Sequence, residues 1–170
     1  MRRFIVTTII LCFGLIVMAQ DYTKTEQGGM HVQPVFEGKI VKDVNSTILT
    51  GKAIEKYNLT KMHTLKLTAN EEQRNRIEEL LLKDYEERNK YDEEVDHEVR
   101  GGHVYYSIFR IAVRSELTFP RVKVSKTRVY LCYQCKPKRT SPVQYEITLV
   151  LLEGENLTLD LLKQNFKRTK

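Results

Sequence analysis

The fold class follows from three stretches of the sequence, which read HVYYSIFRIAV at residues 103–113, TRVYLCYQ at residues 127–134 and VQYEITLVLL at residues 143–152. Each stretch is rich in β-branched and aromatic residues, which are enriched in strands. The segments beside them contain prolines, which are typical of turns and sheet edges. We therefore predict three consecutive strands, His103–Val113, Thr127–Gln134 and Val143–Leu152.

Ahead of these strands, residues 70–90 form the clearest helix. Its start has two candidate caps, Thr68 with Glu71 or Asn70 with Gln73, because such pairs can satisfy the first free backbone N–H groups. Apolar residues recur at helical spacing along the segment, so one face is predicted to be buried. These apolar residues are Ile77, Leu80, Leu81 and Tyr85.

Shorter patterns predict the remaining elements. A final helix follows Gly154, with Thr158 as its cap and with Leu157 and Leu162 placed as a hydrophobic staple. Apolar runs earlier in the chain supply the other candidates. These are a short helix within residues 32–41 and strands at residues 46–50 and 62–67, with residues 51–59 left ambiguous.

The order of these elements predicts the fold class. Helix, two strands, helix, three strands and helix is typical of an α+β domain. We expect an antiparallel sheet of about five strands, covered on one face by two or three packed helices. The 170 residues are 41% hydrophobic and 29% charged, which fits a globular domain and excludes collagen-like, low-complexity and wholly disordered chains. Since neither a repeat nor a linker divides residues 31–170, we predict a single domain there.

The N-terminus predicts export. Arg2 and Arg3 are followed by an uncharged run, Phe4–Met18, and Val17 and Ala19 supply the small residues that signal peptidase requires. The predicted segments are a cleaved signal peptide at residues 1–19 and a flexible leader at residues 20–30. We expect the mature protein to be periplasmic or extracellular and to have no transmembrane segment. The alternative is an uncleaved membrane anchor.

Several motifs resemble those of a known family. They are Thr50-Gly51-Lys52, Tyr57–Thr60 with Thr64-Leu65, a Gly-Gly strand opening at Gly101–Tyr106, and a closing strand and helix at Thr148–Gly154 and Leu157–Phe166. Across residues 31–168 the sequence resembles the domain-of-unknown-function family numbered 6108, which is found in small secreted proteins of Bacteroidota. The resemblance implies a Gram-negative envelope protein, and it brings no activity, cofactor or functional residue.

Cys132 and Cys135 form a C-x-x-C unit at the end of a predicted strand. In an exported protein we interpret them as a candidate disulfide or as two free, partly buried thiols. A redox pair needs a thiolate of low pKa, usually at a helix N-terminus, and here only the basic residues that follow favour one. A zinc site would need two more ligands, and the sequence has no second C-x-x-C. We therefore expect no metal and no cofactor.

No catalytic pattern stands out elsewhere. His97 and His103 resemble a zinc-peptidase helix only superficially, because that motif needs two histidines four residues apart. We interpret them as unrelated surface histidines. The acidic run Asp92–Glu98 lacks the spacing of a calcium-binding loop and is predicted to be a solvated extension of the helix. The sequence also has no G-x-S-x-G nucleophile motif, so we predict no catalytic residue.

Charge is divided along the chain. Acidic residues dominate Glu71–Glu98 and basic residues dominate Arg110–Arg139, within a formal net charge of +6. Basic residues interleaved with tyrosines suit single-stranded nucleic acid in a cytosolic protein, but export favours an anionic envelope polymer or an acidic protein. The alternative is that the acidic helix balances the basic strands within the molecule. The candidate anionic-ligand residues are Arg110, Arg114, Lys123, Lys126 and Arg128.

Together these features predict the class of protein rather than its ligand. We expect an exported, non-enzymatic binding or envelope accessory domain, with no nucleic acid among its partners. The alternative is a thiol-redox or metal-dependent enzyme that uses Cys132 and Cys135.

Overall fold

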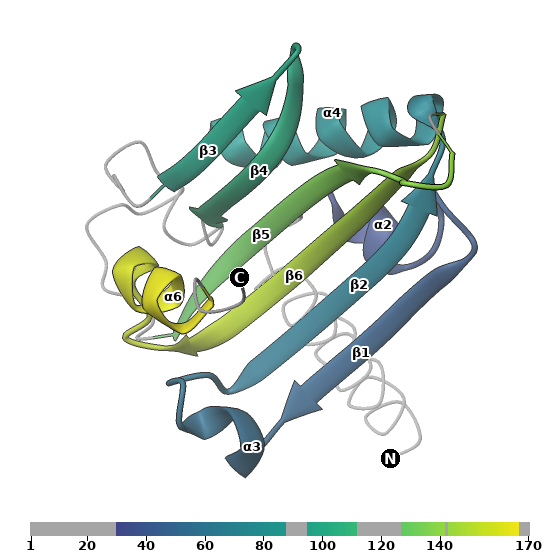
Figure 1. Ribbon diagram of the computed structural model, residues 1–170. Coiled ribbons are helices and arrows are strands. Elements are labelled where there is room, and N and C mark those ends of the chain that lie inside the picture. Colours follow the sequence, from purple (N-terminus) through teal and green to yellow (C-terminus); the bar gives the residue numbers. More distant parts are fainter. Residues whose placement is uncertain (1–29, 88–94, 112–126, 142, 167–170) are drawn as a thin grey trace, which may run out of the picture.

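The computed structural model describes residues 30–87, 95–111, 127–141 and 143–166 (Figure 1). Six strands form one antiparallel sheet in the order β1-β2-β6-β5-β4-β3. The domain is therefore α+β, with one strand more than the sequence predicts. The predicted signal peptide and nearly all of the leader lie outside the described residues. The strands are β1 (Val44–Thr50), β2 (Lys61–Ala69), β3 (Val95–Arg100), β4 (His103–Arg110), β5 (Thr127–Pro137) and β6 (Tyr145–Glu155).

Helices pack on both faces of the sheet (Figure 1). One face is covered by α4 (Glu71–Glu87) and α2 (Gln33–Phe36), and the other is covered at one end by α6 (Leu159–Phe166). The prediction of cover on one face only is corrected here. The physical reason lies in β5, where successive residues point to opposite faces. Tyr130 and Leu131 are both fully buried, so both faces need a helix.

The start of α4 shows which of the two candidate caps forms. The Asn70 side-chain oxygen accepts the Gln73 backbone N–H at 2.9 Å, and the Gln73 side-chain oxygen accepts the Asn70 backbone N–H at 3.0 Å. This reciprocal pair satisfies two donors at the helix start. Along the helix, Ile77 and Leu81 are fully buried, as the apolar spacing predicts.

The additional strand is β3, which occupies the end of the charged run that we expected to extend the helix. That expectation is wrong for residues 95–98, which belong to β3, and residues 92–94 lie outside the described residues. Gly101 and Gly102 both have positive φ angles, +58° and +81°, which suit a tight two-residue hairpin turn and which other residues adopt only with strain. The turn folds β3 back along β4, so Val95 pairs with Phe109.

The shorter helices agree with the sequence patterns. α2 lies within the predicted helical run at residues 32–41, and α3 (Lys52–Glu55) occupies the region left ambiguous. At the start of α6, the Thr158 hydroxyl accepts the Leu161 N–H at 3.2 Å, which confirms the predicted cap. Among the helices that the structure describes, none has the length and apolar composition needed to cross a membrane.

Candidate binding surface

The two cysteines of the C-x-x-C unit lie on opposite faces of β5. Cys135 is buried beneath α4, whereas Cys132 packs beside the cluster under α6. Three residues along a strand span about 10 Å, and a disulfide needs Cα atoms within about 7 Å. Both thiols are free. The candidate disulfide between Cys132 and Cys135 is therefore incompatible with this strand, and the arrangement matches the alternative of two partly buried thiols.

Burial also changes the chemistry of these thiols. It raises the pKa of Cys132 to about 12 and raises the pKa of Cys135 above its ordinary value. A redox-active cysteine needs the opposite change, because the thiolate is the reacting form. The surroundings of the two cysteines therefore favour the neutral thiol.

Two of the five candidate basic residues lie within the described chain. Arg110 pairs with Tyr130, and Arg128 lies two residues from Tyr130 on the same strand, so both arginines are on the face that carries α6. The Arg128 guanidinium donates to the Leu157 carbonyl oxygen at 2.8 Å, just before α6 begins. Arg128 therefore has a structural contact there. The other three candidates, Arg114, Lys123 and Lys126, lie outside the described residues.

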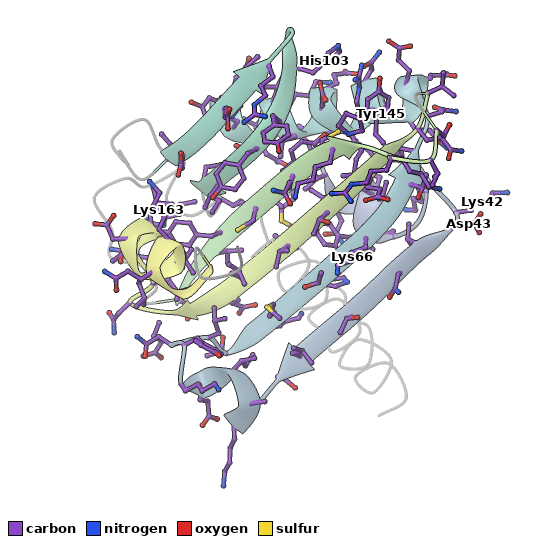
Figure 2. All side chains as sticks on the ribbon, viewed as in Figure 1. Lys42, Asp43, Lys66, His103, Tyr145 and Lys163 are labelled. Carbon is purple, nitrogen blue, oxygen red and sulfur yellow. The ribbon has the colours of Figure 1, made fainter. Side chains whose placement is uncertain are left out.

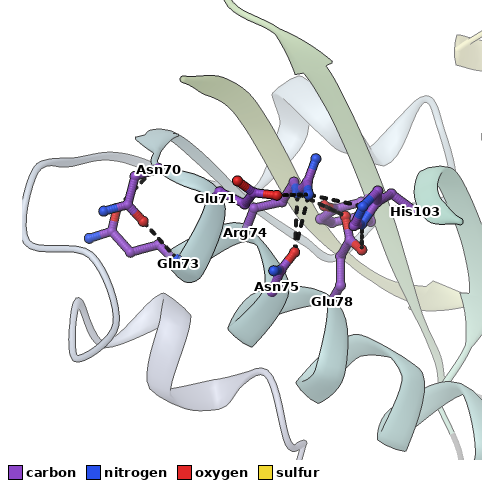
Figure 3. Close-up of polar contacts among 8 residues, drawn as sticks. Asn70, Glu71, Gln73, Arg74, Asn75, Glu78 and His103 are labelled. Carbon is purple, nitrogen blue, oxygen red and sulfur yellow. Dashed lines mark hydrogen bonds and ion pairs between the residues drawn. The ribbon is translucent and has the colours of Figure 1, made fainter. Parts of the chain in front are cut away.

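A buried polar cluster joins α4 to the start of β4 (Figure 3). Arg74 and Glu78 lie four residues apart on α4 and are both buried. Arg74 Nη2 lies 3.0 Å from His103 Nε2, and His103 Nδ1 lies 3.1 Å from Glu78 Oε2. Arg74 Nε lies 3.8 Å from Glu78 Oε1, which closes the triangle. The guanidinium also stacks over the Tyr145 ring, 4.1 Å from its centre.

These contacts fix the tautomer of His103. Because arginine can only donate, Nε2 of His103 accepts from Arg74, and its Nδ1–H donates to Glu78. The Tyr133 hydroxyl also donates to Glu78, at 3.5 Å, and burial raises the pKa of Tyr133. Each polar group of the cluster thus has an internal partner. We interpret it as a structural connection between α4 and the β3–β4 hairpin.

His97 and His103 are both partly exposed, and the His103 side chain is 40% exposed, but each is held by its own structural partners rather than being free at the surface. His97 Nδ1 lies 3.1 Å from the Ser107 hydroxyl, and its ring stacks on Tyr85 with centres 5.0 Å apart. Within the described residues, no three histidine, cysteine, aspartate or glutamate side chains gather closely enough to hold a metal ion. The sequence contained one signal for the buried cluster: Arg74 lies at helical spacing from the apolar residues of α4.

Among the strands that the structure describes, β3 is one edge of the sheet, and it is protected. Its residues Asp96, Glu98 and Arg100 are charged, and its register with β4 shifts between Glu98 and Val99. Lys163 of α6 lies 3.1 Å from Asp96. Charges and bulges on an edge strand discourage pairing with another chain. β3 therefore combines two such features.

β1 is an unprotected sheet edge. Its sequence is VNSTILT, without a charged residue, and six of its seven residues are exposed. Ile48 is 57% exposed and Leu49 is 38% exposed. The strand pairs with β2 in an unbroken register, and within the described chain no strand pairs with its outer side (Figure 1). A regular, uncharged and partly apolar edge is the kind of strand that accepts another strand.

The comparison with family models adds one finding. The model of a family of unknown function, DUF6108, matches residues 19–166. The chain belongs to this family. In this DUF6108 member, both edge strands and the buried cluster lie within the matched residues. No curated protein and no solved structure matches the chain.

Proposed function

We propose that this chain is an exported, non-enzymatic binding module that adds an extended segment of a partner protein to its sheet at β1. The observation that carries the proposal is the contrast between the two edges: β1 is uncharged, regular and exposed, whereas β3 is charged and bulged. Export is supported by the uncharged run Phe4–Met18 that follows Arg2 and Arg3.

The outer main-chain groups of β1 are sufficient for the addition of another strand. An edge strand carries main-chain N–H and C=O groups on its outer side. A partner segment would pair with these groups through hydrogen bonds that each contribute about 0.5–1.5 kcal/mol net. Its side chains would alternate between the two faces, beside Thr47 and Leu49 on one face and Ser46 and Ile48 on the other.

Of the two partner classes that the sequence suggests, the edge favours a protein over an anionic polymer. A sugar polymer lacks the regularly spaced N–H and C=O groups that match a strand. In addition, Arg128 of the candidate anionic surface already donates to the Leu157 carbonyl. In an envelope, a module of this kind would act as an accessory by holding a segment of another exported protein.

The test is a titration followed by nuclear magnetic resonance. The probe is an acetylated and amidated peptide with a core of alternating threonine and valine and with serines at both ends. We expect shifted and more slowly exchanging amides at Val44–Thr50.

A matched pair of variants sharpens this test. Ile48→Lys places a charge on the β1 edge and should weaken binding about tenfold, a loss of about 1.4 kcal/mol. Val99→Lys is the control, because Val99 on β3 is 53% exposed against 57% for Ile48. Perturbation confined to other strands, or equal weakening by both variants, would contradict the proposal.

A further inference from the structure

The charged side chains around β1 are mostly lysines. Lys42 precedes the strand and Lys52 follows it, while Lys61 and Lys66 lie on the neighbouring strand β2. Lys56 lies at the end of α3. None of the four lysines on or beside the two strands forms an ion pair with another described residue. Figure 2 shows Lys66 on the sheet and Lys42 beside the start of β1.

Fewer carboxylates lie in the same region. Asp43 is adjacent to Lys42 (Figure 2), Glu55 lies on α3, and Glu153 pairs with β2 from the side away from the edge. Burial lowers the pKa of His63, and the charge of Lys61 lowers it further, so the neutral form of this histidine is favoured. Among the described residues, five lysines and three carboxylates thus lie around β1, and the excess charge there is positive.

The position of the charges matters as much as their sum. The strand itself is uncharged from Val44 to Thr50, and Lys42 and Lys52 stand just beyond its two ends. A docked segment would lie about 4.8 Å from β1 and about 9.6 Å from β2. Both distances are comparable with the screening length of about 8 Å at physiological salt. Charges at the ends of the segment would therefore interact with these lysines.

We infer that the segment bound at β1 is acidic at its ends: an uncharged, β-branched core flanked on both sides by aspartate or glutamate. This inference rests on the proposed strand addition and names the chemistry of the partner. The uncharged centre of β1 matches the core, and the flanking lysines match the carboxylates.

The same charges oppose pairing with a second copy of the chain. In an antiparallel pair centred on Thr47, Lys42 of one copy and Lys52 of the other would lie just beyond the same end of the paired strands, and this would occur at both ends. Like charges brought together at the ends of the paired strands oppose the pairing. An acidic partner gains attraction at the positions where a second copy meets repulsion.

The experiment compares three peptides with the same threonine–valine core and with two glutamates, two serines or two lysines at each end. Binding to the purified exported protein is measured by fluorescence anisotropy at low salt and at about 1 M salt, where the screening length is about 3 Å. We expect the glutamate peptide to bind at least about tenfold more tightly than the lysine peptide at low salt. This preference should disappear at about 1 M salt.

Two double variants test whether the preference for the glutamate peptide depends on the lysines beside β1. Lys42→Gln with Lys52→Gln should remove most of it while the serine peptide still binds. Lys136→Gln with Arg139→Gln removes the same charge from β5 and its turn, three strands away from β1, and should leave the preference unchanged.

The remaining outcomes distinguish the two proposals. Equal binding of all three peptides would leave strand addition standing and overturn the acidic partner. Absence of binding by every peptide would overturn both proposals. A dimer detected by sedimentation that Ile48→Lys dissociates would assign β1 to a second copy and overturn the acidic partner.

Discussion

β1 and β3 are the outermost strands of the same sheet and are nearly equal in length, with seven and six residues. β3 contacts helices on both faces, since His97 stacks on Tyr85 of α4 and Asp96 pairs with Lys163 of α6. β1 is held mainly by its main-chain pairing with β2. An edge strand fixed by side chains is part of the folded core, whereas an edge fixed by main-chain bonds stays open to a further strand.

The two edges also differ in what a partner would have to displace. At β3 an approaching strand would remove water from three charged residues, Asp96, Glu98 and Arg100, and desolvation of charges is costly. At β1 it would cover hydroxyl groups and the exposed side chains of Ile48 and Leu49. Burial of this apolar surface is favourable. Changes to the side chains that hold β3 should therefore destabilise the protein more than changes on β1.

The largest effect is expected at the cluster that fastens the β3–β4 hairpin to α4. Glu78→Ala removes the partner of Arg74 and His103 within a buried site, so we expect a loss of about 3 kcal/mol in the free energy of unfolding. Urea denaturation measures this loss. Glu79→Ala is the control: Glu79 is exposed and pairs only at the surface with Arg76 and Lys83, so its loss should stay below about 1 kcal/mol. Equal losses would show that the hairpin is not fastened there.

A smaller effect is expected from removing the aromatic contact of β3. Tyr85 stacks on His97 and meets the Phe109 ring edge-on with centres 5.5 Å apart. Because Tyr85 is only partly buried, Tyr85→Ala should cost about 2 kcal/mol. Ile48→Ala on β1 should cost less than about 0.5 kcal/mol, since its side chain is mostly exposed. Thermal unfolding of the two variants measures both losses of stability. A larger loss for Ile48→Ala than for Tyr85→Ala would contradict the proposed difference between the two edges.

The smallest effect is expected at the ion pair between β3 and α6. Lys163→Ala removes the partner of Asp96, and because both side chains are partly exposed, the cost should be about 0.5 kcal/mol and should fall as salt rises. Lys39→Ala removes the more exposed pair with Glu37 and serves as the reference, with a cost near zero. The measurement is urea denaturation at two salt concentrations. A loss that is independent of salt would assign the effect to packing of the Lys163 stem rather than to charge.

Local sequence patterns were sufficient to predict those features that depend on residues within a single helix or strand. The spacing of Ile77 and Leu81 predicted the buried face of α4, and the pair Asn70 and Gln73 was one of two caps that the sequence allowed. The same reasoning gave a wrong prediction for the charged residues before Gly101, because it assigned them to a helix and residues 95–100 form a strand. A helix and an edge strand can both be charged, so the choice depended on contacts with distant residues.

The candidate site was less accessible to local reasoning. The C-x-x-C spacing suggested proximity of Cys132 and Cys135, but a continuous strand places them on opposite faces. The cluster of Arg74 and His103 joins residues that are 29 positions apart, so no local sequence motif predicts this contact.

The sequence by itself determined the α+β class and most of the helices and strands, because periodicity and caps act over a few neighbouring residues. Only the tertiary structure decided which strands lie at the edges of the sheet and which faces receive a helix. A strand lies at an edge when no other strand pairs with its outer side, and this depends on the order of all six described strands. The uncharged sequence of β1 therefore became informative only once it was known that, among the described strands, β1 pairs with β2 alone.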